Sequence, residues 1–480
     1  MAHIHSDRGP QLAHSPGQDP RYSAARDIVV TLRDAGHQAY LAGGCVRDLL
    51  LGASPLDYDV ATSATPEIIL SLFPDKKALT VGAHFGVVLV CEPSDGEDNG
   101  ISTEIATFRH DGAYSDGRHP DSVRFSTNPE EDVQRRDFTI NGMLLDPSVF
   151  DQTGDTSAAT LDFVGGRPDL AARTIRAIGD PARRFAEDKL RMLRAVRFAA
   201  RLDFEIEPQT FAAIRDAASQ ISQVSLERVR DELTLMLTEG RARRAFELLN
   251  TTGLLAQILP EATRMHGVQQ PPEFHPEGDV WIHTILLLEK LPAGVSPTLA
   301  WGALLHDIGK PATFRAPDPT DPHDRIRFNG HVEVGVRMAE KILSRLRFSN
   351  EETAQIVALV KNHMRFADVM HMRQSTLKRF LRLSNFDEHL ELHRIDCLSS
   401  HADLSLYNFA KEQYEHAPKE DIRPKLLLTG RELIAAGYRP GPKFKTMLDA
   451  AEDAQLEGTV ATPEQALALL RERFGRPPSA

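Results

Sequence analysis

A paired-glycine turn, followed closely by two aspartates, is the feature that most constrains this chain. An apolar run ends at Ala42, and Gly43-Gly44 follows it directly. Paired glycines are typical of a backbone that adopts positive φ or approaches a ligand closely. We expect a strand up to Ala42, then the turn, then a short helix over Val46–Leu51. A glycine turn that leads into a helix favours anion binding, because free N–H groups point outward at the helix N-terminus.

The two aspartates, Asp57 and Asp59, predict a metal site next to this turn. Their i, i+2 spacing in a strand puts both carboxylates on one face. Two like charges held close together require a cation, and Mg²⁺ prefers carboxylate and phosphate oxygens. The alternative is a pair of solvated aspartates on a strand edge. Glu104, in the strand-like segment Ile101–Phe108, is our candidate for a third catalytic carboxylate, or else a structural ion-pair partner for Arg109.

Two further runs, Arg135–Asn141 and Glu187–Arg191, complete a recognisable set with Gly43–Asp48. In order, spacing and residue type the set resembles the class II tRNA nucleotidyltransferases, which add CCA to tRNA 3′ ends, and the related bacterial poly(A) polymerases. The resemblance extends from about Tyr40 to about Leu237. It implies a mixed-sheet, polymerase-β-like head, and it identifies Arg109–Pro120 with the flexible loop used in switching from C to A addition. The triphosphate ligands that follow from the turn and the resemblance are Gly44, Arg47 and Arg136.

A charged helix face after Glu187 is our candidate for base recognition. At 100° per residue, one face collects the apolar side chains Met192, Leu193, Val196, Ala199 and Ala200. The broadly opposite side collects Asp188, Arg191, Arg194 and Arg197. A salt-bridged solvent face is the alternative. The family resemblance favours base reading, because a carboxylate only accepts and a guanidinium only donates hydrogen bonds, which suits cytosine and adenine but not guanine and uracil.

A second constellation, rich in histidine, lies in the second half of the chain. Imidazole and carboxylate groups together suit divalent metals. Their arrangement resembles the HD domain of metal-dependent phosphohydrolases, with the motif residues His283, His306, Asp307 and Asp396. His331 and His363 are further candidate ligands, and Asp403 is an alternative to Asp396. The resemblance implies a second divalent-metal site in addition to the Mg²⁺ site.

Composition sets limits on where the protein works and what it binds. The net charge is −12, which is unexpected for an RNA-binding protein, but a local basic stretch between Arg173 and Arg201 can contact phosphate. Three scattered cysteines predict neither a disulfide framework nor a cysteine zinc site. No apolar run approaches transmembrane length, and the N-terminal segment lacks the apolar core of a signal peptide. We therefore expect a cytoplasmic protein that does not bind membranes.

These patterns predict an α+β chain in which a small mixed-sheet head precedes helical domains. The expected parts are a disordered tail (1–21), a nucleotidyltransferase head (22–163), a helical neck (164–260), an HD domain (261–400) and a C-terminal helical region (401–480). The expected function is template-independent CCA addition to tRNA from CTP and ATP by two-metal chemistry, with an HD phosphohydrolase activity.

Three alternative functions stay open at this point. One is a poly(A) polymerase, although Val81–Val90 lacks the basic run that this family tends to carry. A CC-only enzyme is less favoured, because the Arg109–Pro120 loop is intact. The last is an HD phosphohydrolase with a degenerate RNA-binding head, against which the intact Asp57 and Asp59 pair argues.

Overall fold

The computed structural model describes residues 19–476 except 75, 81–85, 92–99, 113, 115, 116, 118, 119, 322 and 419–421. The chain forms two compact units, Met1–Met236 with Arg244–Ile258, and Leu237–Arg243 with Leu259–Ala480. The expected head and neck share the first unit, and the expected HD and C-terminal regions lie in the second. Of the expected tail, residues 1–18 lie outside the described residues, and a helix begins at Pro20.

A mixed seven-stranded sheet forms the head, in the order β3-β4-β5-β2-β1-β8-β9. Its strands are β1 (Ala39–Ala42), β2 (Asp59–Thr62), β3 (Lys77–Thr80), β4 (Val87–Cys91), β5 (Ser102–Thr107), β8 (Met143–Leu145) and β9 (Thr160–Asp162). The β2–β5 pair is parallel and the other pairs are antiparallel. This arrangement confirms the predicted α+β class with a mixed-sheet head.

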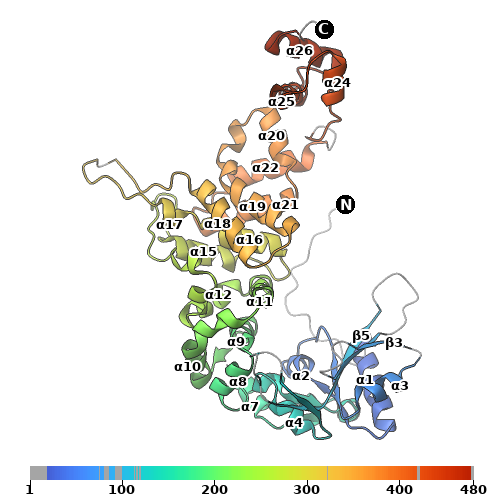
Figure 1. The fold of residues 1–480 in the computed structure, drawn as a ribbon. Coiled ribbons are helices and arrows are strands. Elements are labelled where there is room, and N and C mark those ends of the chain that lie inside the picture. Colours follow the sequence, from blue (N-terminus) through green and yellow to red (C-terminus); the bar gives the residue numbers. More distant parts are fainter. Residues whose placement is uncertain are drawn as a thin grey trace. The chain divides into compact units, whose positions relative to one another are not determined.

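Short helices and a hairpin surround this sheet (Figure 1). Helix α1 (Pro20–Asp34) packs along β1, β2 and β5, and its N-cap Asp19 accepts from the Arg21 N–H. The remaining head elements are α2 (Gly44–Leu50), α3 (Pro66–Leu72), β6 (Arg109–Asp111), β7 (Val123–Phe125), α4 (Pro129–Gln134), η3 (Thr139–Asn141), α5 (Pro147–Thr153) and α6 (Thr156–Ala159). Helix α2 begins at Gly44 and not at Val46 as predicted, because Gly43 with φ +78° already serves as its N-cap.

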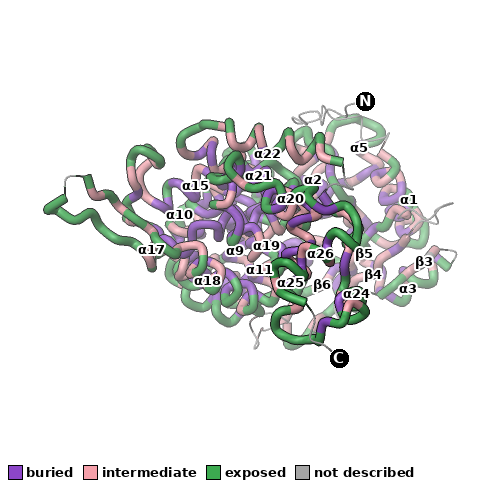
Figure 2. Tube along the Cα trace, turned by 90° about the horizontal axis from the view of Figure 1, so that it is seen from above, coloured by how far each residue is buried: buried purple, intermediate pink, exposed green. Residues whose placement is uncertain are grey.

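Helices dominate after β9. They are α7 (Gly166–Ala171), α8 (Pro181–Glu187), α9 (Leu190–Leu202), α10 (Pro208–Ala217), η4 (Ala218–Gln223), α11 (Leu226–Thr238), α12 (Ala242–Thr251) and α13 (Leu254–Ile258). A two-residue parallel ladder, β10 (Thr174–Ile175) with β11 (Glu205–Ile206), interrupts the predicted all-α neck. The predicted apolar face of α9 is buried in full, and Figure 2 shows this helix mostly in the colour of buried residues.

The second unit is helical, in the order α14 (Pro260–Thr263), α15 (Val280–Glu289), α16 (Pro297–Leu305), α17 (Lys310–Thr313), α18 (His331–Arg345), α19 (Asn350–Asn362), η5 (His363–His371), α20 (Gln374–Leu381), α21 (Phe386–Ser399), α22 (Ser405–His416), α24 (Gly430–Ala435), α25 (Lys443–Leu456) and α26 (Pro463–Phe474). Within the described part of the chain, no helix combines the length and apolarity needed to cross a membrane.

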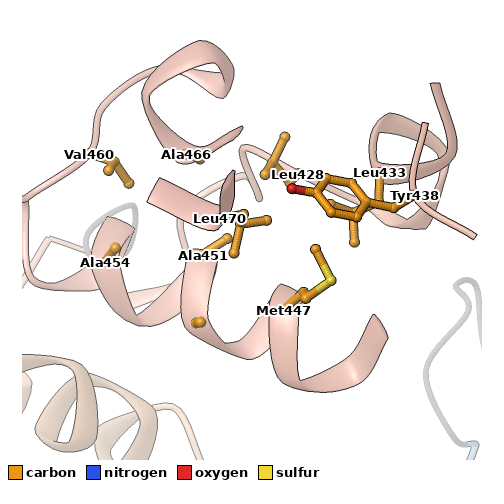
Figure 3. Close-up of a cluster of buried hydrophobic side chains, with 10 residues drawn as sticks. Leu428, Leu433, Tyr438, Met447, Ala451, Ala454, Val460, Ala466 and Leu470 are labelled. Carbon is orange, nitrogen blue, oxygen red and sulfur yellow. The ribbon is translucent and has the colours of Figure 1, made fainter. Parts of the chain in front are cut away.

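The C-terminal region contains parts of two separate cores. Ala410 and Ile422 pack with Phe366 and Phe380, so the core on the HD side continues past residue 400. A second core begins at Leu428 and joins α24, α25 and α26, as Figure 3 shows. Its buried members are Leu428, Leu433, Tyr438, Met447, Ala450, Ala451, Ala454, Val460, Ala466 and Leu470.

This second core generates a local stability prediction. Leu433 is fully buried in it, whereas the next residue, Ile434, is 53% exposed. We expect Leu433→Ala to lower the local unfolding free energy of α24–α26 by about 2–5 kcal/mol, because a buried leucine leaves a cavity. Ile434→Ala should change it by less than about 0.5 kcal/mol. Hydrogen exchange of peptides from residues 428–470 measures both, and equal effects of the two variants would contradict this account of the core.

Candidate nucleotide site and candidate metal centre

Three carboxylates meet at the start of β2. Asp59 is its first residue. Glu104 lies on the neighbouring parallel strand β5, next to Ile105, and Ile105 pairs with Val60 of β2. Asp57, Asp59 and Glu104 line one cavity of about 590 Å³. Burial raises the pKa of Asp59 to about 7, and the Asp57 and Glu104 carboxylates add to the rise. Such a cluster favours a cation between its oxygens.

Asp57 itself lies outside the strand, contrary to the prediction that both aspartates belong to it. Asp59 pairs with Ala42, the last residue of β1. Gly43 then turns the chain away at φ +78°, which leaves no strand residue for Asp57 to pair with. The two carboxylates nevertheless line the same cavity, as their spacing predicts.

The glycine turn lies against Arg136. A Cβ atom at Gly43 would come within 3.2 Å of Arg136 Nη1, so a side chain there would crowd the guanidinium. Arg136 Nη2 donates to Asp132 at 3.1 Å, while its Nε is buried with no partner among the described residues. An unsatisfied buried donor at a cavity wall suits an anionic ligand. Gly44 lines the same cavity.

Arg47, by contrast, is mostly occupied by protein partners. It is only 3% exposed, and its Nη1 donates to Asn141 Oδ1 at 2.7 Å. Its Nε donates to Asp48 at 2.8 Å, and its guanidinium lies over the Phe198 ring at 5.3 Å. Arg47 therefore forms part of the cavity floor.

A chain of buried polar contacts continues from Asn141 into the neck. Asn141 Nδ2 donates to Asp137 Oδ1 at 3.1 Å, and Arg194 donates to Asp137 Oδ2 at 2.9 Å. Arg197, only 7% exposed, donates to Glu232 at 2.7 Å, and Arg194 lies 3.7 Å from the same carboxylate. Burial alone would raise the pKa of Asp137, but Arg194 outweighs it and holds that pKa below its usual value. Arg197 is thus a buried ion-pair partner, which corrects its expected place on an open helix face.

Asp188 is not part of the helix that carries the arginines, so the prediction of a single helix presenting all four side chains is wrong. Asp188 adopts extended backbone, with φ −145° and ψ 108°, between α8 and α9. Its carboxylate accepts from the Leu190 N–H at 3.0 Å and from Arg228 Nη2 at 2.8 Å. Capping of this kind competes with helical hydrogen bonding and separates α8 from α9.

Arg191 is held by main-chain carbonyls and by one carboxylate. Its Nη1 donates to Glu187 at 2.8 Å, and its Nη2 donates to the Arg135 carbonyl at 3.0 Å. Arg184 donates to the same carbonyl at 3.2 Å. Asp188, Arg191, Arg194 and Arg197 all line the cavity that holds the three carboxylates.

The loop expected to move during catalysis is described only in part. Residues 113, 115, 116, 118 and 119 of Arg109–Pro120 lie outside the described residues, as do residues 81–85 of the segment compared with poly(A) polymerases. Arg109 forms an ion pair with Asp111 at 2.9 Å. Tyr114 donates to the same aspartate at 2.6 Å. Arg109, which the sequence analysis considered as an ion-pair partner for Glu104, therefore has Asp111 as a partner in the structure.

The HD residues come together as one cluster within the second unit. His283 Nε2 lies 3.0 Å from Asp396 Oδ1 and 3.3 Å from His306 Nε2, and these three residues form what we call the first half-site. His331 Nε2 lies 3.4 Å from His363 Nε2, and both face Asp307 Oδ1, at 3.8 and 3.7 Å.

Asp307, His331 and His363 form the second half-site. Asp307 links the two, because its other oxygen, Oδ2, lies 3.2 Å from His306 Nε2.

The histidines of this cluster have pKa values that are shifted in opposite directions, with burial lowering that of His363 to about 4. Burial lowers the pKa of His283, but the hydrogen bonds that its ring nitrogens donate to Asp396 and Glu277 outweigh this effect and raise that pKa to about 9. Asp403, the alternative ligand, is exposed and accepts from the Ser405 N–H, whereas Asp396 belongs to the cluster. Neutral imidazoles with carboxylates suit a divalent metal.

A cavity of about 730 Å³ opens beside both half-sites. Its lining includes Lys310, Arg325, Phe274 and Phe328. Lys310 Nζ contacts Asp307 Oδ2 at 2.7 Å, so a cationic side chain stands directly next to the candidate metal ligands.

Several residues of these sites escaped the sequence analysis. In the first unit they are Asp137 and Asn141, which were named only as part of the Arg135–Asn141 run, and Arg228 and Glu232 of α11; in the second unit they are His275, Glu277 and Lys310. The four-residue spacing of Arg228 and Glu232 signalled one helix face. The partners of that face, Asp188 and Arg197, could not be inferred from spacing, because they lie 40 and 35 residues away along the chain.

Comparison with known protein families agrees with this layout. Residues 39–176 match the family model described as Poly A polymerase head domain. Residues 203–265 match Probable RNA and SrmB-binding site of polymerase A, and residues 280–396 match HD domain.

Several similar proteins and structures are named CCA-adding enzyme. A CCA-adding enzyme of Levilactobacillus brevis is 30% identical over 458 residues, which covers 95% of this chain and 98% of the relative. A CCA-adding enzyme of Geobacillus stearothermophilus is 40% identical over 239 residues, which is 50% of this chain and 55% of that protein. The crystal structure of the Bacillus stearothermophilus CCA-adding enzyme in complex with CTP has a TM-score of 0.69 at 26% identity and covers 95% of this chain and 99% of that one. The Thermotoga maritima CCA-adding enzyme complexed with tRNA, at 19% identity and TM-score 0.54, shares the fold. With similarity to the first relative along almost its whole length, this chain belongs to the family of CCA-adding enzymes, which are tRNA nucleotidyltransferases.

Proposed function

We propose that this protein adds CCA to tRNA 3′ ends from CTP and ATP, and that it does so in the cytoplasm at the cavity lined by Asp57, Asp59 and Glu104. The primer 3′-oxygen attacks the α-phosphorus of the nucleotide. A new phosphodiester bond forms, the bond from the α-phosphorus to the bridging oxygen breaks, pyrophosphate leaves and the hydroxyl proton is released. The observation that carries the proposal is that three carboxylates and Arg136 line one cavity.

The carboxylates would hold divalent metal. The oxygens of Asp57 and Asp59, with Glu104 as a third candidate, match the ligand preference of Mg²⁺. When bound, two such ions would activate the attacking hydroxyl and stabilise the leaving oxygen. The raised pKa of Asp59 supports this assignment, because a nearby cation would relieve the repulsion among the carboxylates.

Triphosphate and base would occupy the basic part of the same cavity. Gly44 and Arg136 bind phosphate oxygens, with Arg47 on the floor beneath them. Asp188 and Arg191 read the edge shared by cytosine and adenine, since one only accepts and the other only donates hydrogen bonds. Arg194 and Arg197 support them through Asp137 and Glu232. In this proposal the head provides the carboxylates and the phosphate contacts, and the neck provides the base-reading residues.

A poly(A) polymerase and an HD phosphohydrolase with a degenerate head are the alternatives. The intact carboxylate cluster argues against a degenerate head. Incubation of the protein with tRNA that ends before CC, together with CTP, ATP or both, followed by sequencing of the ends, decides among them. Addition of C residues and then one A supports our proposal, and long A tails would contradict it.

We further propose that the HD cluster is a second, hydrolytic centre. The two half-sites around Asp307 would hold divalent metal, and Lys310 would contact an anionic oxygen of a phosphate ester in the adjoining cavity. Its candidate ligands all belong to the second unit, whereas the residues that line the nucleotide cavity all belong to the first.

The carboxylate assignment predicts a selective loss of chemistry. Asp57→Asn and Asp59→Asn should each abolish addition of C and A while tRNA binding stays near wild type, because metal positioning is lost and the RNA surface is not. Asp34→Asn, an exposed aspartate near the end of α1, serves as the control. Single-turnover rates and a filter-binding assay measure both properties. More than a few per cent activity in both variants would remove the metal assignment.

The base-reading assignment predicts relaxed selection. Asp188→Ala should lower the ratio of kcat/KM for CTP over UTP, because the carboxylate attracts the exocyclic amine and repels the carbonyl of uracil. Each unpaired group costs about 1–3 kcal/mol, which is roughly 5- to 150-fold. Arg228→Ala should lower the same ratio by releasing Asp188.

Exposed Asp216, in α10, provides the control for this experiment as Asp216→Ala. An unchanged ratio in Asp188→Ala, with only a slower overall rate, would make Asp188 structural. Arg191→Ala is expected to behave like Asp188→Ala, with a larger general loss because its guanidinium also holds Glu187 and the Arg135 carbonyl.

The two-centre proposal predicts separable activities. The double variant His306→Ala with Asp307→Ala should lose metal-dependent hydrolysis of cyclic and linear phosphate esters and keep CCA addition close to normal. Phosphate release and tRNA end sequencing are measured on the same preparation. If the folded double variant fails to add nucleotides, the two centres are not independent.

A further inference from the structure

A buried carboxylate, Glu277, lies directly behind one ligand of the HD cluster. Its Oε1 accepts from His283 Nδ1 at 2.7 Å and from His275 Nδ1 at 2.9 Å. The side chain is 7% exposed, and its Oε2 is buried with no hydrogen-bond partner in the described part of the chain. Because a carboxylate only accepts, Glu277 holds a proton on His283 Nδ1, so Nε2, which faces Asp396 and His306, is the nitrogen available to a metal.

The other three histidines of the cluster are oriented differently. Each directs its Nδ1 at a main-chain carbonyl three residues earlier, at 2.7 to 2.9 Å: His306 at Ala303, His331 at Phe328 and His363 at Val360. A carbonyl fixes the same tautomer but carries no net charge. Of these four imidazoles, only His283 has an anionic partner behind it, so the two half-sites are not equivalent.

The loop that carries Glu277 is anchored at several points. Gln269 and Asp279 form an isolated β-bridge. Asp279 caps α15 by accepting from the Ile282 N–H at 2.7 Å, and it also accepts from the Gly267 N–H at 2.8 Å. These bonds fix the loop against the helix that presents His283. Glu277 is thus positioned before any metal arrives.

We propose that Glu277 is a positioning residue that strengthens metal binding selectively at the first half-site, that of His283, His306 and Asp396. Its negative charge makes His283 Nε2 a stronger electron-pair donor to a metal, and its hydrogen bond with Nδ1 fixes the orientation of the ring. The second half-site, with His331 and His363 on main-chain carbonyls, gains nothing from it. The two half-sites therefore bind metal with unequal affinity. This inference rests on the proposed metal centre of the HD cluster.

Co²⁺ alone, titrated into the full chain against a competing chelator, tests the inference. The background His331→Ala with His363→Ala removes the second half-site, so that the remaining affinity and d–d absorption belong to the first. In that background Glu277→Ala should weaken Co²⁺ binding by about 10- to 100-fold. Glu277→Gln should weaken it less, because the amide oxygen still accepts from Nδ1. Glu273→Gln, an exposed carboxylate of the same loop, should have no effect.

A double-mutant comparison separates positioning from general damage to the fold. Once His283→Ala has removed the imidazole, Glu277→Ala should have no further effect on Co²⁺ binding at the second half-site. If Glu277→Ala lowers Co²⁺ affinity equally in the His331→Ala/His363→Ala background and in the His283→Ala background, or in neither, the inference is overturned while the metal centre remains. Failure of the wild-type chain to bind Co²⁺ would overturn the metal centre and the inference together.

Discussion

Burial of arginine side chains beside the nucleotide cavity is the constraint on which the first unit depends. Arg47 bonds to Asn141, Asn141 to Asp137, Asp137 to Arg194, and Arg194 and Arg197 share Glu232. Removal of one partner from a buried pair costs about 3–5 kcal/mol, since the remaining charge is left without compensation. The contacts join α2, η3, α9 and α11. Helix α9, which carries Arg191, is thereby fixed to α2 and η3 of the head.

A cavity that binds a nucleotide triphosphate together with cations needs both carboxylates and arginines, and these must not simply pair with one another. The carboxylates of Asp57, Asp59 and Glu104 gather where β2 begins, while the arginines come from the Arg135–Asn141 segment and from helices α2, α9 and α11. Most of these arginines already bond to carboxylates of their own, so their geometry is set before a ligand arrives. Arg136, whose buried Nε has no partner among the residues that the structure describes, retains capacity for a further anion. A triphosphate with bound metal ions would complement both sets of charges: its phosphates would face the arginines, and its cations would face the carboxylates.

Residue types and local periodicity predicted much of this architecture. The strand around Glu104 and the buried stripe of α9 both follow from local patterns, and both agree with the structure. The failures involve partners that lie far away along the chain. Asp188 leaves the helix because of a local cap and the distant Arg228, and Arg197 is buried because Glu232 compensates it. The resemblance to the HD domain also indicated the candidate metal ligands, but their separation into two half-sites depends on a packing of helices that the motif does not contain.

The two centres handle crowded ionisable groups in opposite ways. In the head, carboxylates repel one another, and the pKa of Asp59 is raised to about 7, so its ionised form is disfavoured until a cation arrives. In the HD cluster, burial of Asp307 is outweighed by Lys310 and His306, which hold its pKa well below the usual range. The carboxylates of the head therefore lack compensation among themselves, which a bound cation would supply. Asp307 instead has a compensating cation, Lys310, within 2.7 Å in the protein itself.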